Sequence, residues 1–335
     1  MRLPEGKIPV DVLREIVFKN LGVKREEVVL GPAVGVDGAV IDVENKSLIV
    51  SMDPITGATK RIGWLAVNIN ANDIATFGVQ PAFFSSCIML PGKGDRKTLE
   101  TICTQMNEAA KALGIAIIGG HCEVTPGLKN AIVVGCVMGI TEKGNYVTAN
   151  GAKAGDKLIL TKSAGIEGTA ILATEKEEKL KNVLKTALLQ RAQKLYDRIS
   201  VVKDAMTATK AGEVNAMHDP TEGGVSGGIH EMAEASNLGF RVYEERIRVQ
   251  PETSKICEFF EIDPLQLISS GALLISAKPE SADKIVEKLG QKDVDASIIG
   301  EFLRNSQEHT LVRKNGVRHT LPKPVCDHLW LALKK

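Results

Sequence analysis

Four short polar clusters in the first half of the chain contain residue types that could bind a cation. Asp37 lies in a turn of small residues, and Asp53 ends the alternating segment that follows it. Asn70 and Asp73 interrupt an apolar stretch at a spacing of three, which puts both side chains on one face of a helix. The fourth cluster covers residues 119–123, Gly-Gly-His-Cys-Glu. Carboxylates without basic residues beside them favour a hard cation such as Mg²⁺.

Each of these acidic residues also has an ordinary structural explanation. Aspartate is common in turns and at strand ends, so Asp37 and Asp53 could stand there without a chemical role. Asn70 and Asp73 are harder to explain, because a buried polar group without a partner costs on the order of 1–3 kcal/mol. We therefore expect the side chains of Asn70 and Asp73 to meet a partner inside the protein.

A fifth cluster lies in the second half, at residues 217–224 (Met-His-Asp-Pro-Thr-Glu-Gly-Gly), ahead of a helix expected at 225–238. Paired glycines before a helix would expose backbone N–H groups to an anion, and the helix dipole adds to that attraction. A plain entry from a loop into a helix would have the same sequence. The sequence contains neither a P-loop nor a Rossmann glycine motif, and His121, Cys122 and His218 are poorly spaced for zinc.

Strands and helices alternate around the first four clusters. A hairpin formed by two segments, 39–43 and 48–52, separates Asp37 from Asp53. Asn70 and Asp73 belong to a helix at 64–77, which Gly78 ends. The other elements expected in this half are a helix at 99–113, a short buried strand at 115–118 and a strand at 131–138.

The composition changes to small and polar residues at 151–156, which predicts two domains, 1–150 and 151–335. Strands and helices mix in both halves, so the expected class is α+β (mixed α/β). The strands expected in the second half are 157–161, 272–277 and 296–301. The remaining expectations are a helical, charge-rich stretch at 175–210, a glycine-rich turn at 223–228, a helix near 280–290 and a type I′ hairpin turn at 315–316.

The overall composition excludes several classes of protein. The 335 residues contain 42 Lys and Arg against 41 Asp and Glu, a formal net charge of +1. This balance argues against nucleic acid or a membrane surface as a partner. The six cysteines form no C-x-x-C pair, and no apolar run approaches the roughly 18 residues of a membrane span. We expect a cytoplasmic protein with reduced thiols.

The clusters, taken in order, resemble motifs of the superfamily of aminoimidazole ribonucleotide synthetase, whose branches include thiamine-monophosphate kinase, selenophosphate synthetase and the hydrogenase expression/formation protein HypE. The motifs of the first half are VDGAVI at 36–41, SMDP at 51–54, GWLAVNINANDIATFGVQP at 63–81 and GGHCEV at 119–124. Those of the second half are GAKAGDKLILT at 151–161, AMHDPTEGGVSGGIHEMAEASNLG at 216–239, DPLQLISSGALLIS at 263–276 and IIGE at 298–301. The last three are most similar to the HypE branch.

This resemblance implies a homodimer in which the N-terminal sheets of two subunits join into a barrel, with ATP bound in a cleft. It implies magnesium ligands at Asp37, Asp53 and Asp73, and a catalytic part for Asp37, Asp73 and Asp219. The other residues implied in cofactor binding are Asn70, Gly119, Gly120, Glu123, Thr221, Gly223 and Gly224. The implied reaction phosphorylates an oxygen of a small or thiol-bound acceptor, and the implied partner is a protein of a maturation complex.

Two departures leave alternatives open. The HypE branch ends in a reactive cysteine after Pro-Arg-Ile, whereas Cys326 is followed here by a segment with an apolar, helical pattern, and it could equally be a packed residue. His121 stands where relatives carry a metal-binding Asp, so either Glu123 replaces that ligand or the metal arrangement differs. A kinase of the thiamine-monophosphate type is an alternative, weakened by Val36 in place of an acid. A nucleotide-binding partner protein without turnover is another.

Overall fold

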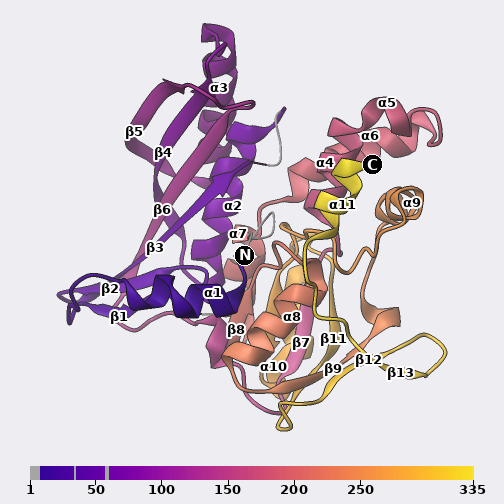
Figure 1. Ribbon diagram of the computed structural model, residues 1–335. Coiled ribbons are helices and arrows are strands. Elements are labelled where there is room, and N and C mark those ends of the chain that lie inside the picture. Colours follow the sequence, from indigo (N-terminus) through magenta and orange to yellow (C-terminus); the bar gives the residue numbers. More distant parts are fainter. Residues whose placement is uncertain (1–7, 34, 57–59) are drawn as a thin grey trace.

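The computed structural model describes residues 8–33, 35–56 and 60–335. The chain forms two sheets, one from β1 to β6 and one from β7 to β13, with helices packed on each (Figure 1). The first sheet ends at Glu142 and the second begins at Lys157. The domain boundary expected near residue 150 therefore falls in the link between the two sheets. The mixed α/β class is confirmed.

The first sheet has the strand order β1-β2-β3-β6-β4-β5, in which only β4 and β5 run parallel. Its longest helices are α2 (Ile62–Thr76) and α3 (Arg96–Leu113). The strands are β1 (Val28–Leu30), β2 (Ala39–Val43), β3 (Lys46–Ile55), β4 (Pro81–Pro91), β5 (Ala116–Thr125) and β6 (Ile132–Glu142). The predicted hairpin and both predicted helices are confirmed, and Gly78 follows α2 with a left-handed φ of 72°.

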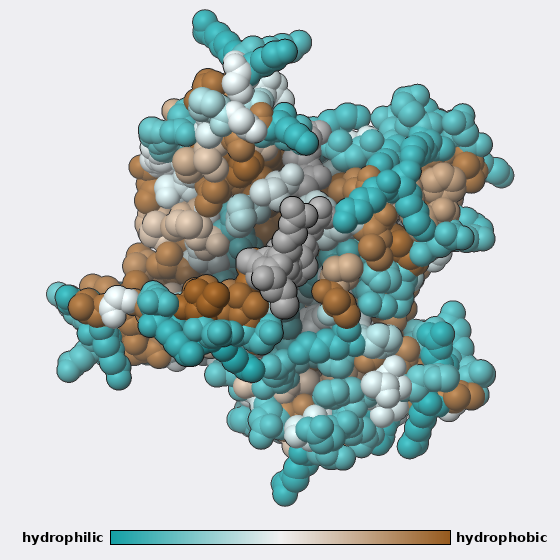
Figure 2. All heavy atoms as spheres, in the orientation of Figure 1, coloured by the Kyte–Doolittle hydropathy of each residue, from teal (hydrophilic) through white to brown (hydrophobic). Residues whose placement is uncertain are grey.

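Alternate side chains of β3 and β6 point to opposite faces of the first sheet. Ile49 and Val137 are buried, whereas Val50 and Met138, which face each other across the two strands, are half-buried. Apolar side chains on this half-buried face are unusual, because the face of a sheet that is exposed to solvent is normally polar. Figure 2 shows hydrophobic residues gathered on the flank where Figure 1 draws β4, β5 and β6.

The second sheet has the order β13-β12-β9-β11-β7-β10-β8. Its strands are β7 (Lys157–Thr161), β8 (Val214–His218), β9 (Gly239–Tyr243), β10 (Leu274–Ala277), β11 (Ala296–Leu303), β12 (His309–Val312) and β13 (Arg318–Thr320). The helices outside the first sheet are α1 (Val10–Glu15), α4 (Ile166–Glu175), α5 (Glu177–Leu180), α6 (Thr186–Lys194), α7 (Val202–Ala211), α8 (Gly224–Ala235), α9 (Pro251–Phe260), α10 (Pro279–Gly290) and α11 (His328–Lys334). Of the described helices, none is long and apolar enough to span a membrane.

Four predictions of local structure are wrong in part. The strand at 115–118 is the exposed edge strand β5 rather than a buried one. The stretch 175–210 is broken into short helices. The turn at 223–228 is mostly the start of α8, where a Cβ on Gly228 would lie 2.9 Å from side-chain atoms of both Leu274 and Pro220. The hairpin at 315–316 pairs β12 with β13, but only Gly316 has a positive φ, so its turn is not type I′.

Candidate functional site

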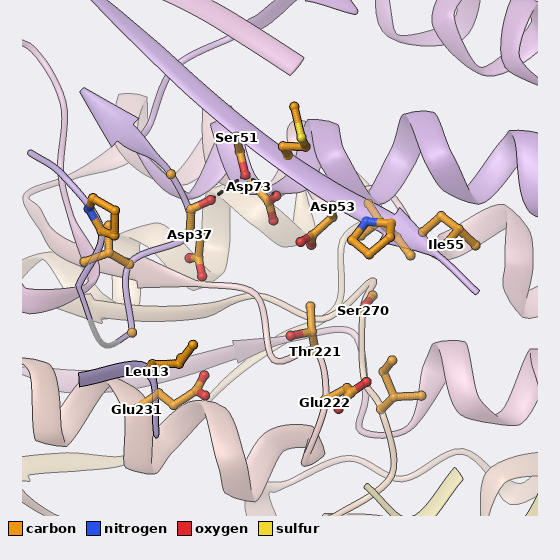
Figure 3. A pocket seen from close by; sticks show the side chains of 18 of the residues that line it. Leu13, Asp37, Ser51, Asp53, Ile55, Asp73, Thr221, Glu222, Glu231 and Ser270 are labelled. Carbon is orange, nitrogen blue, oxygen red and sulfur yellow. Dashed lines mark hydrogen bonds between the residues drawn. The ribbon is translucent and has the colours of Figure 1, made fainter. Parts of the chain in front are cut away.

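A cavity of about 810 Å³ lies between the two sheets and their helices (Figure 3). The first domain contributes α1, the hairpin and α2, and the second contributes α4, the segment before α8, and α11. Six described lining residues are acidic, and none of the described lining residues is Lys, Arg or His. The acidic residues are Asp37, Asp53, Asp73, Glu167, Glu222 and Glu231. The cavity therefore has a negative lining, which suits a cation.

Asp73 lies on the wall of the cavity, and its side chain is almost inaccessible, with the residue 4 % exposed. The Ser51 hydroxyl is 2.6 Å from Asp73 Oδ2 and 2.6 Å from the backbone oxygen of Asp37. Burial raises the pKa of Asp73 well above its usual range, and the charges of Asp53, Asp219 and Asp37 raise it further. Four carboxylates from separate motifs therefore lie close enough to disfavour one another's ionisation.

Asn70 finds its partner in the backbone of the neighbouring strand. Its Oδ1 accepts a hydrogen bond from the Asp53 N–H at 2.9 Å, and its Nδ2 donates to Ala66 O at 2.8 Å and to Asp53 O at 3.3 Å. A Cβ on Gly135 would approach Asn70 Nδ2 to 2.4 Å, so glycine is needed at that place in β6. Asn70 thus attaches β3 to α2 and sets the position of Asp53.

His218 connects two carboxylates from different parts of the chain. Its Nδ1 lies 2.9 Å from Asp37 Oδ2, and its Nε2 lies 2.8 Å from Glu231 Oε2. Burial lowers the pKa of His218, but the charges and hydrogen bonds of the two carboxylates outweigh burial and raise that pKa well above its usual value. A protonated His218 donates from both ring nitrogens, and so it fixes Asp37 against α8.

Asp219 is the most poorly satisfied carboxylate near the cavity. Both of its oxygens are buried, and neither has a hydrogen-bond partner among the described residues. Burial raises the pKa of Asp219 to about 8, with Asp37 and Asp53 raising it and His218 lowering it. A buried carboxylate without donors is costly unless a cation meets it.

A divalent cation fits this group of residues. Asp37, His218 and Asp219 each offer a ligand atom, and these atoms lie within 4.8 Å of one another. Because both nitrogens of His218 already contact carboxylates, the ligands left for a hard cation are oxygens. Asp37, Asp53 and Asp73, the three predicted magnesium ligands, all line the cavity, with the orphaned Asp219 oxygens close to them. Their role as ligands stays a prediction.

The segment before α8 has its N–H groups already engaged. Gly223 N donates to Asp327 Oδ2 at 2.7 Å, and Gly224 N donates to Thr221 O at 3.0 Å. The side chain of Thr221 lines the cavity (Figure 3). Binding of a phosphate by Gly223 and Gly224 stays a prediction, and it would require the Asp327 carboxylate to give up its bond.

The motif on β5 lies away from this cavity in the same chain. Gly119, Gly120 and Glu123 belong to the exposed edge strand and are not among the described lining residues. Glu123 instead contacts His121 Nε2 at 3.3 Å and the Thr125 hydroxyl at 2.6 Å. Their part in cofactor binding stays a prediction, and within one subunit they do not meet Asp37 or Asp73.

Several residues of the site did not stand out in the sequence. The sequence points to His218 only as a poorly spaced zinc ligand and to Ser51 only as part of a motif. Glu167 and Glu231 could have been found from the sequence, because each is an acidic residue in a helix of mainly apolar and small residues. Glu167 belongs to α4 and Glu231 to α8. Trp330, from the apolar segment after Cys326, also lines the cavity.

Two family models match the chain. The N-terminal domain of AIR synthase related protein matches residues 35–141, and the C-terminal domain of the same family matches residues 153–312. The chain belongs to the AIR synthase related family. The matched ranges contain Asp37, Asp53, Asp73 and Asp219, and they leave α1 and α11 outside.

Curated members of the AIR synthase related family resemble this chain over most of its length. A protein of Methanocaldococcus jannaschii, named provisionally for hydrogenase expression and formation, is 29 % identical over 329 residues, covering 96 % of this chain and 95 % of the relative. The carbamoyl dehydratase HypE of Escherichia coli is 28 % identical over 282 residues, covering 83 % of this chain and 81 % of HypE. The resemblance to the HypE branch is thereby confirmed.

Solved structures share the two-domain fold. The crystal structure of a HypE–HypF complex matches with a TM-score of 0.76 at 22 % identity, covering 93 % of this chain and 99 % of that one. A crystal structure of HypE in complex with ATP matches with a TM-score of 0.71 at 22 % identity, covering 96 % of both chains. At these identities the likeness establishes the fold, and the predicted AIR synthetase-like architecture of the chain is confirmed.

Proposed function

We propose that this protein is an ATP-dependent enzyme of the HypE type, which binds Mg-ATP in the cavity and phosphorylates an oxygen of an acceptor. The observation that carries the proposal is the convergence of Asp37, Asp53 and Asp73 on the wall of the cavity, with the buried Asp219 close enough to act on Asp73. The magnesium that accompanies ATP would supply positive charge to these carboxylates. The ATP complex of HypE, which has the same fold, supports the choice of nucleotide.

The chain's own residues have three tasks in this reaction. Asp37, Asp53 and Asp73 would hold the magnesium, with Asp219 close by, and magnesium would neutralise charge on the phosphates. His218 and Asn70 would keep Asp37 and Asp53 in position through the hydrogen bonds described above. The acceptor oxygen would form a bond to the γ-phosphorus as the bond to ADP breaks. Positioning and charge neutralisation then do most of the catalysis.

The acceptor is proposed to be a separate molecule rather than the chain's own C-terminus. Cys326 is half-buried and directly precedes Asp327, whose carboxylate accepts hydrogen bonds from Leu329 N and Gly223 N, both at 2.7 Å. Leu329 and Ala332 are buried. These contacts hold the segment after Cys326 against the protein. The intact mass after incubation with ATP and magnesium tests this point, since an adduct that disappears in Cys326→Ala would contradict it.

We extend the homodimer and the maturation pathway to this protein as part of the same proposal. The apolar open face of the first sheet and the exposed strand β5 offer a surface for a second copy, which would cover them. A dimer would also give Gly119, Gly120 and Glu123 a route to the partner's cavity. The names of the relatives and the HypE–HypF complex support hydrogenase maturation, with a maturation protein as partner.

Turnover separates this proposal from a nucleotide-binding protein without activity. We expect the purified protein to release ADP from ATP slowly in the presence of magnesium, and Asp37→Ala to lose this activity. Asp283→Asn, which changes an exposed residue on α10, is the matched control and should keep the wild-type rate. Equal rates of ADP release in wild type and Asp37→Ala would contradict the proposal. Phosphate transfer to thiamine monophosphate would instead favour the kinase alternative.

A further inference from the structure

The cavity has a second group of polar residues on the side of α4 and α11. Glu167, near the start of α4, lines the cavity and is 4 % exposed, and Ser270, from the segment before β10, is fully buried. Trp330 from α11 lines the same cavity, and α11 packs against α4. Ser270 is drawn on the side of the cavity opposite Asp53 (Figure 3). This group is therefore distinct from the carboxylates of the hairpin and α2.

Each of these three residues has a buried polar atom without a hydrogen bond. Within the described part of the chain, Glu167 Oε2, Ser270 Oγ and Trp330 Nε1 make no hydrogen bond of normal geometry, although the Ser270 hydroxyl is close enough to Glu167 to lower the pKa of its carboxyl. Leaving a buried polar atom unpaired costs free energy, and for a carboxylate the cost is higher than for a hydroxyl. Three such atoms around one cavity are polar groups that a ligand could satisfy.

The charge of this region indicates which ligand would fit. Glu222 also lines the cavity, and its charge, like those of Asp327 and Asp53, acts on Glu167. No described lining residue is Lys, Arg or His, so no such side chain of the lining pairs with Glu167. The unpaired oxygen of Glu167 needs a hydrogen-bond donor, and a donor that carries positive charge would stabilise this buried carboxylate best. Ile171, Ile268 and Leu329 add an apolar wall beside it.

We propose that Glu167, Ser270 and Trp330 form the acceptor subsite of this enzyme and that the acceptor is a small organic cation, a primary ammonium on an apolar body that also carries the oxygen to be phosphorylated. The ammonium would donate to Glu167 and Ser270, the acceptor oxygen would accept from Trp330 Nε1, and the apolar body would pack on Ile171 and Leu329. The assignment of this site to the acceptor rests on the proposed function, whereas the cation site itself rests only on the unpaired buried atoms of Glu167, Ser270 and Trp330.

Saturation-transfer NMR on the full-length protein tests the site with n-butylammonium as probe and n-butanol as its neutral counterpart. We expect n-butylammonium to bind and n-butanol to bind at least several-fold more weakly. Glu167→Gln should weaken n-butylammonium binding about tenfold or more, because a charged hydrogen bond is lost. Glu178→Gln, whose side chain is 89 % exposed on α5, is the matched control and should leave binding unchanged.

The subsite is overturned if n-butanol binds as well as n-butylammonium, or if Glu167→Gln leaves binding unchanged. Ser270→Ala provides a second test should Glu167→Gln fail to fold, and it should weaken n-butylammonium binding several-fold. Undiminished binding in a folded Ser270→Ala variant would also overturn the site. Binding of Mg-ATP is measured separately on the same samples. A wild-type protein that binds Mg-ATP but not n-butylammonium would overturn this inference alone. A wild-type protein that binds n-butylammonium but not Mg-ATP would overturn the proposed function alone.

Discussion

At the scale of single residues, the protonation of the cavity carboxyls affects the stability of the protein. Burial raises the pKa of Asp73, Asp219 and Glu167, and neighbouring carboxylates raise each further. These groups cost stability whenever they ionise without a cation, because the unfolded chain solvates the same charges freely. The site thus trades stability for the capacity to bind positive charge, as functional sites commonly do.

Glu167→Gln should change how stability depends on pH. Burial raises the pKa of Glu167 from 4.5 to about 7, with charges at Asp327, Glu222 and Asp53 contributing. The folded pKa lies above the unfolded one, so wild type carries no penalty below about pH 4.5 and the full penalty above about pH 7. As the pH rises from 4.5 to 8, the free energy of unfolding of Glu167→Gln should therefore increase by about 3 kcal/mol relative to that of wild type, as measured by urea unfolding. A difference in the free energy of unfolding that does not change with pH would contradict a raised pKa at Glu167.

At the scale of elements, the periodicity of the sequence predicted most strands and helices, but it did not predict which of them are buried or which distant residues they contact. The alternation in 39–52 and the apolar stretch before Gly78 were enough to predict the hairpin and α2. The apolar run 115–118 predicted a buried strand, yet β5 lies at the sheet edge, because burial depends on strand order and on contacts between distant residues. For the same reason, no local pattern linked His218 to Asp37, which are 181 positions apart.

The short helix α11 depends on one aspartate. Asp327 Oδ1 accepts from Leu329 N and Oδ2 accepts from Gly223 N, each at 2.7 Å, so this side chain both caps α11 and joins it to the segment before α8. We expect Asp327→Ala to lower the free energy of unfolding by about 1–2 kcal/mol. Chymotrypsin should also cleave the variant faster after Trp330, a residue of α11.

Cys326→Ser is the control for that experiment, because it changes the neighbouring side chain and leaves both hydrogen bonds of Asp327 in place. Its free energy of unfolding and its rate of chymotryptic cleavage should stay closer to those of wild type than those of Asp327→Ala do. If Asp327→Ala were cleaved no faster than Cys326→Ser, α11 would not depend on the cap.

At the scale of the whole molecule, the open face of the first sheet indicates a second copy. Ile118 on the edge strand β5 is 56 % exposed, and Ile117 and Val124 on the same strand are also exposed. Sedimentation equilibrium should give a dimer for wild type and a monomer for Ile118→Glu, because a charge in an apolar interface is unpaired when buried. Val317→Glu, on an exposed loop of the second domain, should remain dimeric. A monomeric wild type would contradict the dimer.

The proposed function depends on ATP binding to the cavity through a magnesium ion held by Asp37, Asp53 and Asp73. Calorimetric titration of ATP into the full-length protein, with magnesium and then with chelator, tests this most directly in wild type, Asp73→Asn and the control Asp283→Asn. We predict ATP binding only with magnesium, at least tenfold weaker in Asp73→Asn and unchanged in Asp283→Asn. Equal affinity with chelator, or undiminished affinity in Asp73→Asn, would contradict the account.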